Sequence, residues 1–249
     1  MNENVFLPGV PVDKVTAKLS AAAGNELESG KLESPNSSSA LAVNAFGWFM
    51  GEPASLPYLP GQIGGAQEVD IEYQARFPWS GGKHPWLDAA VITSSQLIGV
   101  ESKRFEPFRG AKAAKLSDAY ERPVWGDQMG PFEDVRDQLK QHQLNYKFLD
   151  ATQLVKHAFG LVTEAGRRGL EPMLVYIFLE PAEMCTKSIS MDMHDAHRKE
   201  IADFASRVDE AVVGFNAISY ADWLAHWPKE GAVGEHAQNL RERFSIAPA

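Results

Sequence analysis

The stretch LDAAVITSSQLIGVESK, at residues 87–103, constrains the fold of this chain more than any other segment. Two apolar runs, Ala89–Ile92 and Leu97–Val100, flank the polar sequence TSSQ. Short apolar runs on either side of a polar turn are typical of paired antiparallel strands. The sequence therefore predicts a buried β-hairpin whose turn lies at Ser94 and Ser95.

The open end of this hairpin brings charged residues together. Pairing outward from the turn places Asp88 opposite Glu101, and facing Cβ atoms of an antiparallel pair lie about 4.5–5.5 Å apart. Two carboxylates at that distance repel, so one must take up a proton or a cation must lie between them. Lys103 follows Glu101 by two positions and is expected on the same face of the sheet, whereas Ser102 points away.

These residue types predict a divalent metal site. Carboxylate and carbonyl oxygens suit Mg²⁺, which keeps several waters and accepts phosphate oxygens of a substrate. We expect Asp88 and Glu101 to hold Mg²⁺, or Mn²⁺ in its place, with the backbone carbonyl of Ser102 as a further ligand. Glu72, in the polar register of the preceding strand, is an additional candidate. Lys103 would hold an attacking water or stabilise negative charge that develops at phosphorus.

The other periodic segments predict a mixed α/β sheet with helices packed on its faces. Residues 68–79 alternate as a strand does, with Val69, Ile71 and Tyr73 among those expected on one side. The apolar run MLVYIFLE, at 173–180, indicates a strand buried on both faces. Helices are expected at 12–23, 40–51, 132–142, 150–169 and 195–212, and a strand followed by a helix or turn at 215–227.

Polar residues and a glycine predict where these helices begin and end. Ser37–Ser39 can cap the helix at 40–51, and Asp150 or Thr152 can cap the helix at 150–169. Gly169 is expected to end that helix, because glycine readily adopts the left-handed conformation of a helix C-terminus. Asp192 is expected to cap the helix at 195–212.

Length and composition favour one domain of generous size: 249 residues, of which 44% are hydrophobic. We expect an N-terminal extension or linker at 1–36, a core domain at 37–227 and a C-terminal tail at 228–249. The single Cys185 excludes an internal disulfide framework and any zinc motif with two cysteines. With neither a secretory signal nor a long apolar stretch, the expected location is the cytoplasm, with no membrane span.

The hairpin residues resemble the signature of the PD-(D/E)XK nuclease superfamily. That signature is an aspartate, about a dozen residues and then Glu-x-Lys across a β-hairpin, here Leu87-Asp88 and Glu101-Ser102-Lys103, with Leu87 in place of the signature's proline. The resemblance implies a restriction-endonuclease-like core of helix, three-stranded meander, helix and strand, with extra helices. It also implies Mg²⁺-dependent hydrolysis of phosphodiester bonds, with DNA as the expected substrate. A homodimer would be in keeping with the many dimers of this fold.

The resemblance extends to the helix that follows the meander. Gln153 and Lys156 are expected to support the site from that helix. Some members of the superfamily carry an aromatic residue four positions after the glutamine, whereas this chain has His157, which we interpret as a core histidine. The superfamily's first-helix glutamate has no counterpart in SSSALAVNAFGWFMG, and Glu72 is its proposed substitute.

A basic segment leaves the hairpin directly. SKRFEPFRGAKAAK, at 102–115, carries Arg104, Arg109, Lys112 and Lys115, which could contact the phosphates of a nucleic acid. An ordinary solvated basic loop is an equally good interpretation. The net charge of −9 excludes an overall basic field, so any binding of nucleic acid depends on a local patch.

Two other functions remain open. The net charge and the missing helix glutamate favour a catalytically silent protein that keeps the nuclease fold for nucleic-acid binding or scaffolding. A hydrolase of a small phosphorylated or nucleotide substrate is the weaker alternative. His194 and His197, with Asp195 between them, are residue types that bind transition metals. No further strong ligand lies nearby in the sequence, so we interpret all three as ordinary helix residues. No nucleophile elbow and no phosphate-binding loop motif occurs in the chain.

Overall fold

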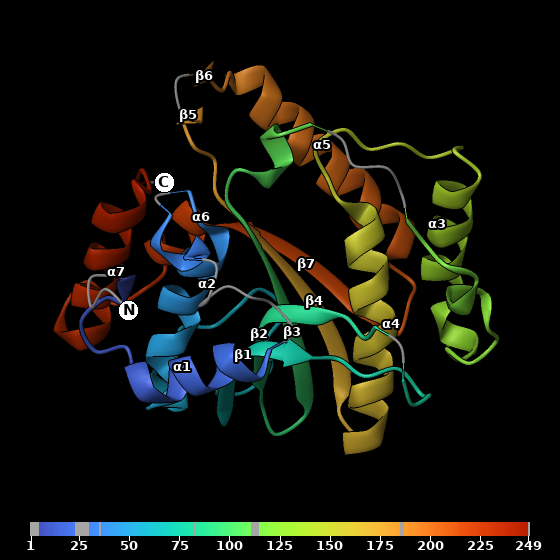
Figure 1. Cartoon of the computed structure of the whole chain (residues 1–249), viewed down its shortest axis with the longest axis horizontal. Helices are drawn as coiled ribbons and strands as arrows, with labels where there is room; N and C mark the ends of the chain where they lie inside the picture. The colour runs from blue at the N-terminus through green and yellow to red at the C-terminus, as the bar shows by residue number, and fades with distance from the viewer. Residues whose placement is uncertain are drawn as a thin grey trace.

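A mixed sheet with helices on both faces forms the centre of the molecule (Figure 1). The computed structural model describes residues 5–22, 30–34, 36–81, 83–110, 115–184 and 187–248. Within them, the main sheet has the order β1 (Glu68–Gln74), β2 (Trp86–Ile92), β3 (Gln96–Lys103), β4 (Glu171–Phe178) and β7 (Gly214–Ser219). The first three strands are antiparallel, and β3, β4 and β7 are parallel. The predicted mixed α/β class is confirmed.

Helices surround this sheet, and most begin and end close to the predicted positions. The α-helices are α1 (Val12–Ala21), α2 (Ser38–Gly47), α3 (Gly130–Lys140), α4 (Ala151–Arg168), α5 (Met191–Val208), α6 (Tyr220–Ala225) and α7 (Gly231–Phe244). Short 3₁₀ turns lie at Lys31–Glu33, Trp48–Met50, Pro53–Ser55, Glu106–Phe108, Asp118–Glu121 and Asp127–Met129. A small separate hairpin pairs β5 (Glu183–Met184) with β6 (Lys187–Ser188).

The register of the predicted hairpin is confirmed. Ala89 pairs with Val100, and Thr93 donates its backbone N–H to the Gln96 carbonyl at 3.0 Å across the turn. Counting outward from the turn, the last regular β2–β3 pair is Ala89 with Val100, and Asp88 is the next residue beyond it. The two strands therefore separate where the charged residues begin.

Two apolar cores lie on opposite faces of the sheet. Side chains from α1, α2 and α7 cover one face, and side chains from α3, α4 and α5 cover the other (Figure 1). Because β4 lies between β3 and β7, its apolar side chains are buried on both faces, as the run at 173–180 predicted. Burial on both faces makes β4 a fixed support for β3, which carries the candidate site.

Strand β1 changes its facing direction partway along. Val69 and Ile71 pack in the core beneath α2, but Tyr73 packs in the core beneath α4. The prediction that all three share one side was therefore wrong. The physical reason lies at Glu72, which has φ 47° and interrupts the pairing of β1 with β2. A non-glycine residue in this left-handed region breaks the two-residue repeat of a strand.

Glycines allow α4 to lie close against the meander. A Cβ added to Gly99 of β3 would come within 2.8 Å of Leu161 on α4. A Cβ added to Gly160 of α4 would come within 2.8 Å of the Ala75 carbonyl oxygen. Since neither position tolerates a larger side chain without movement, this close approach brings polar residues of α4 within reach of β3.

The ends of the long helices agree with the sequence in one case and differ in another. The Asp150 side chain accepts the Gln153 N–H at 3.0 Å at the start of α4, and Gly169 follows α4 with φ 66°, both as predicted. Asp192 was expected to cap the next helix, but α5 begins at Met191, after Ser190 in an extended conformation. Asp192 therefore lies in the first helical turn, where a carboxylate still interacts favourably with the helix dipole.

The two ends of the chain contribute to the same core. Val15 and Leu19 of α1 and Leu240 and Phe244 of α7 are buried in the same apolar cluster, which also holds α2. The core thus includes residues outside the predicted 37–227 segment. Helix α7 begins at Gly231, inside the segment that the sequence indicated as a tail.

Candidate active site

A buried ion pair occupies the end of β3. Lys103 Nζ donates a hydrogen bond to Glu101 Oε1 and another to Gln153 Oε1, the latter at 2.9 Å. The Glu101 side chain is 2% exposed and that of Lys103 is 11% exposed. Ser102 lies between them on the other face, where its Oγ is 2.7 Å from the Tyr220 hydroxyl. The alternation of β3 therefore directs the acid and the amine toward α4.

Asp88 lies beside this pair on β2. Its Oδ2 accepts the backbone N–H of Ser102 at 2.7 Å, beyond the last regular backbone pair of the hairpin. In a strand, the N–H and C=O of one residue point toward the same neighbour. The Ser102 carbonyl is consequently directed to the side on which Asp88 lies.

The charges at this site influence one another strongly. Burial, followed by the negative charge of Glu101, raises the pKa of Asp88 well above its ordinary value. Burial alone would raise the pKa of Glu101 as well, but Lys103 and His157 hold it at about 2. Burial alone would lower the pKa of Lys103, but Glu101 and Asp88 raise it. Lys103 and Glu101 are therefore ionised at neutral pH, and Asp88 is the carboxyl group that takes up a proton when no cation is bound.

Helix α4 contributes two residues on one face. Gln153 contacts Lys103, and His157, one turn later, places its Nδ1 3.1 Å from Glu101 Oε2. Neither of these two atoms makes a well-aligned hydrogen bond within the described residues, although both are buried. His157 is thus buried, as the sequence indicated, but its ring lies against the site. The four-residue spacing from Gln153 is the signal that could have shown this. Lys156 points instead toward the Tyr120 ring, with Nζ 5.9 Å from its centre.

Glu72 lies in the same row of the sheet. Its neighbours Ile71 and Tyr73 pair with Ala89 and Leu87, so Glu72 is level with Asp88. The negative charge of Glu72 makes a small further contribution to the raised pKa of Asp88. The register thus aligns three acidic residues across three adjacent strands.

The oxygen atoms at this site fit Mg²⁺ only in part. Within the described residues, no group of three or more Asp, Glu, His or Cys side chains is arranged to hold a metal ion by itself. The oxygen donors at the site are the carboxylates of Asp88 and Glu101 and the backbone carbonyl of Ser102, and Glu101 Oε2 lies 3.1 Å from His157 Nδ1 without a well-aligned hydrogen bond. This set suits a cation that keeps waters and takes further oxygens from a substrate, as Mg²⁺ does.

The predicted phosphate contacts are not all on the surface. Arg104 is buried, and its guanidinium lies 4.7 Å from the centre of the Phe105 ring and 5.3 Å from that of Phe244. The structure therefore does not place it with the exposed basic residues Arg109 and Lys115. Lys112 lies outside the described residues.

A basic groove lies along the start of α4. It has a volume of about 650 Å³, and its polar and aromatic lining includes Lys83, His84, Trp86, Lys115, Lys156, Gln153 and His157. Gln153 and His157 line the groove and also contact the Lys103–Glu101 pair, which itself lies behind that lining. Lys83 and Trp86 were not identified from the sequence. They lie in the turn before β2 and at its first residue, where an isolated lysine and tryptophan carry no recognisable pattern.

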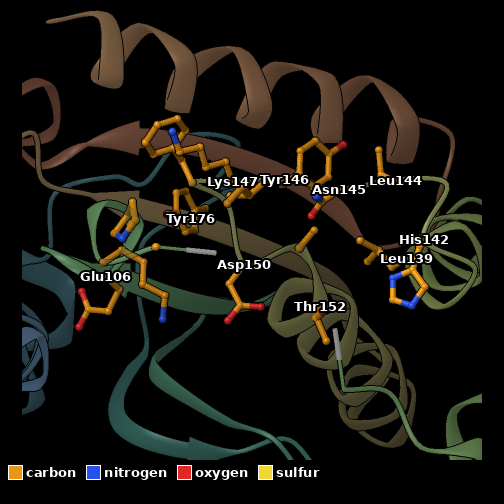
Figure 2. A pocket seen from close by; sticks show the side chains of 16 residues that line it. Glu106, Leu139, His142, Leu144, Asn145, Tyr146, Lys147, Asp150, Thr152 and Tyr176 are labelled. Carbon is orange, nitrogen blue, oxygen red and sulfur yellow. The ribbon is translucent and has the colours of Figure 1, made fainter. Parts of the chain in front are cut away.

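A second cavity, of about 270 Å³, shares Asp150 and Thr152 with the groove (Figure 2). Glu106 and Tyr176 lie toward one end of it in Figure 2, and Lys103 also lines it. The Tyr176 hydroxyl lies 3.0 Å from His197 Nε2, and burial lowers the pKa of His197 to about 4. His197 is thus neutral at pH 7 and structural, in agreement with its interpretation as a helix residue.

The fold and the site together define a class of protein. A mixed sheet whose meander ends in an aspartate, a glutamate and a lysine, with a polar helix against them, is consistent with the restriction-endonuclease-like α/β fold. The chain belongs to the family described as Restriction Endonuclease associating with ARP, whose model matches residues 2–245.

The family description indicates a nuclease that acts on nucleic acid. Comparison with curated proteins found no match, and comparison with solved structures found none. Among the described helices, none combines the length and the apolar character that crossing a bilayer requires.

Proposed function

We propose that this chain is a Mg²⁺-dependent nuclease of the PD-(D/E)XK superfamily that hydrolyses phosphodiester bonds in DNA. The observation that carries the proposal is the buried Glu101–Lys103 pair next to Asp88, in contact with Gln153 and His157, which line a groove that also holds three lysines. Burying two charges is costly unless they are closely paired. Apolar residues in the same place would stabilise the fold about as well as this ion pair does. Its position beside residues that line a groove therefore supports a chemical role.

The residues have distinct roles in this proposal. Asp88, Glu101 and the Ser102 carbonyl would hold Mg²⁺, with Glu72 as a further ligand. When bound, Mg²⁺ polarises a phosphate oxygen and makes a water more acidic. Lys103 positions the attacking water and stabilises negative charge at phosphorus, and Gln153 and Glu101 fix the direction of its ammonium group. The water attacks phosphorus in line with the departing 3′ oxygen.

The basic groove supports nucleic acid as the substrate. Lys83, Lys115 and Lys156 line a groove that shares Asp150 and Thr152 with the cavity lined by Lys103, so a phosphate backbone lying in the groove would pass close to the candidate site. Such contacts do not require a basic protein overall, because each phosphate is neutralised locally. The exposed Arg109 would extend this contact.

A catalytically silent binding protein is the second candidate. Helix α2 carries no acidic residue, so the site lacks the helix carboxylate expected of an active member of the superfamily. The net charge of −9 points in the same direction. The family description also names an association with ARP, and binding to such a partner is compatible with both candidates.

Substitution of Lys103 separates the two candidates. Wild type and Lys103→Ala are incubated with plasmid, single-stranded DNA and RNA in Mg²⁺ or Mn²⁺, with EDTA as the control. We expect wild type to cut and Lys103→Ala to lose about 100-fold or more in rate, while a Mg²⁺-dependent shift in melting temperature remains. Lys199→Ala, on the exposed side of α5, is the matched control and should cut as wild type does. A variant without Lys103 that still cuts normally would exclude the catalytic assignment.

A further inference from the structure

The proposed function assigns no ligand to the cavity that Lys103 lines. Figure 2 shows Lys147, Tyr146, Asn145 and Leu144 along one side of it, and Asp150 and Thr152 on the other. Its volume of about 270 Å³ corresponds to about nine water molecules, since each takes about 30 Å³ in the liquid. That space suits one flat, ring-sized group and is too small for a base pair.

The wall formed by residues 142–149, which connect α3 to α4, is held in place by α5. Glu200 of α5 accepts the backbone N–H groups of Lys147 at 2.8 Å, Phe148 at 2.7 Å and Leu149 at 2.8 Å. The Tyr146 hydroxyl donates to Asp203 at 2.5 Å. Three hydrogen bonds to one carboxylate fix the backbone, so the cavity exists before any ligand binds.

The lining of the cavity combines buried rings and apolar side chains with polar groups. Leu139, Tyr146, Phe148 and Tyr176 are buried, and the buried ammonium-bearing Lys103 also lines the cavity. Asn145 is exposed, and Asp150 and Thr152 are partly exposed. A nucleobase has the complementary form, with two apolar faces and a polar edge of donors and acceptors, and bases taken out of a helix are held between apolar side chains in this way.

The position of the cavity links it to the site. Lys103 lines it, and Asp150 and Thr152 border both the cavity and the basic groove. A strand whose phosphates follow the lysines would therefore cross the first turn of α4 with a base at the mouth of the cavity. We infer that the cavity receives one unpaired nucleobase next to the phosphate held at Lys103, which makes DNA with an unpaired nucleotide the preferred substrate. This inference rests on the proposed nuclease function.

The experiment compares binding of three DNA hairpins in EDTA, so that cleavage does not enter the result. One is fully paired, one carries a single bulged thymine, and one carries an abasic bulge with the same backbone. Fluorescence anisotropy should give at least about tenfold tighter binding of the thymine bulge than of the abasic bulge, as expected for stacking one base. Leu144→Trp, which fills the cavity, should reduce this ratio to within about twofold. Gln143→Trp, exposed and outside the cavity, is the matched control and should keep the ratio.

Equal affinity of wild type for the two bulges would overturn the inference, as would an unchanged ratio in a folded Leu144→Trp. If Leu144→Trp fails to fold, permanganate oxidation of the bulged thymine in the wild-type complex tests the inference instead. Bound wild type should protect that base, and full reactivity in the complex would contradict its burial. Absence of cleavage in Mg²⁺ together with a retained tenfold ratio would remove the proposed function but leave the base pocket, so the two failures are distinguishable.

Discussion

The two ends of the β2–β3 hairpin differ in how their buried polar groups are compensated. At the turn, the Gln96 side chain accepts the Ile63 N–H at 2.6 Å and donates to the Gly61 carbonyl at 3.2 Å. At the open end, one buried Glu101 oxygen lies 3.1 Å from His157 Nδ1 without a well-aligned hydrogen bond, close to the partly exposed Asp88. The turn end is neutral and satisfied, whereas the open end holds charges that are not fully compensated. Unsatisfied buried charge is expected where a ligand completes the site.

The largest effect is expected from Glu101→Gln, which neutralises one member of the buried pair. Lys103 would remain as a buried ammonium without its carboxylate, which should lower the free energy of unfolding by about 3–5 kcal/mol. We also expect the cleavage rate to fall by about 100-fold or more. Urea denaturation and a plasmid cleavage assay measure the two effects. If Glu101→Gln lost activity but kept full stability, the ion pair would not support the fold.

Asp88→Asn tests the charge repulsion at the open end. The amide oxygen can still accept the Ser102 N–H, so mainly the charge changes. Because the pKa of Asp88 is raised in the folded state, the fold favours its protonated form, and wild type loses that contribution as pH rises through the raised pKa. Asn stays neutral, so the variant should be the more stable protein at pH 7 in EDTA, and the difference should shrink as the pH falls.

Melting curves of wild type and Asp88→Asn from pH 4 to pH 8 measure this difference. Glu101 has the opposite dependence: its pKa is lowered to about 2, so its contribution is present above about pH 4.3 and is lost below that value. The comparison is therefore read above about pH 4.3, where Glu101 stays ionised in both proteins. A pH-independent difference between the two proteins in that range would show that folding does not raise the pKa of Asp88. Mg²⁺ should raise the melting temperature of wild type but not of the variant.

The smallest effect is expected at the turn, from Gln96→Ala. This substitution leaves the Ile63 N–H and the Gly61 carbonyl without their partner, which should lower the free energy of unfolding by about 1–3 kcal/mol. Cleavage should be unchanged, because the charged end of the hairpin keeps its contacts. A loss of activity as large as that of Glu101→Gln would mean that the two ends are coupled. Urea denaturation with the same cleavage assay provides the comparison.

Features that depend on neighbouring residues were predictable from the sequence. The hairpin register follows from two apolar runs of equal length around TSSQ, and the start of α4 follows from Asp150 at its cap. Both depend on local hydrogen bonds and on the two-residue repeat of a strand. The placement of Glu101 and Lys103 on one face follows from the same repeat.

Features that depend on distant contacts were not predictable in the same way. Arg104 follows a charged strand end and was expected at the surface, but Phe244 from the far end of the chain covers it. Tyr73 was expected beside Ile71, but the positive φ of Glu72 turns it to the other core.

The sequence by itself determined the charged hairpin end and the order of the five strands of the main sheet with helices α1 to α5, because short-range pairing and periodicity fix them. Only the tertiary structure decided that α4 approaches closely enough for Gln153 and His157 to touch the Lys103–Glu101 pair. Close packing at Gly99 and Gly160 positions that helix. The hydrogen bonds from the backbone of residues 147–149 to Glu200 position the cavity at the start of the helix. These contacts join residues about 50 or more positions apart, and no local pattern in the chain specifies which of them will meet.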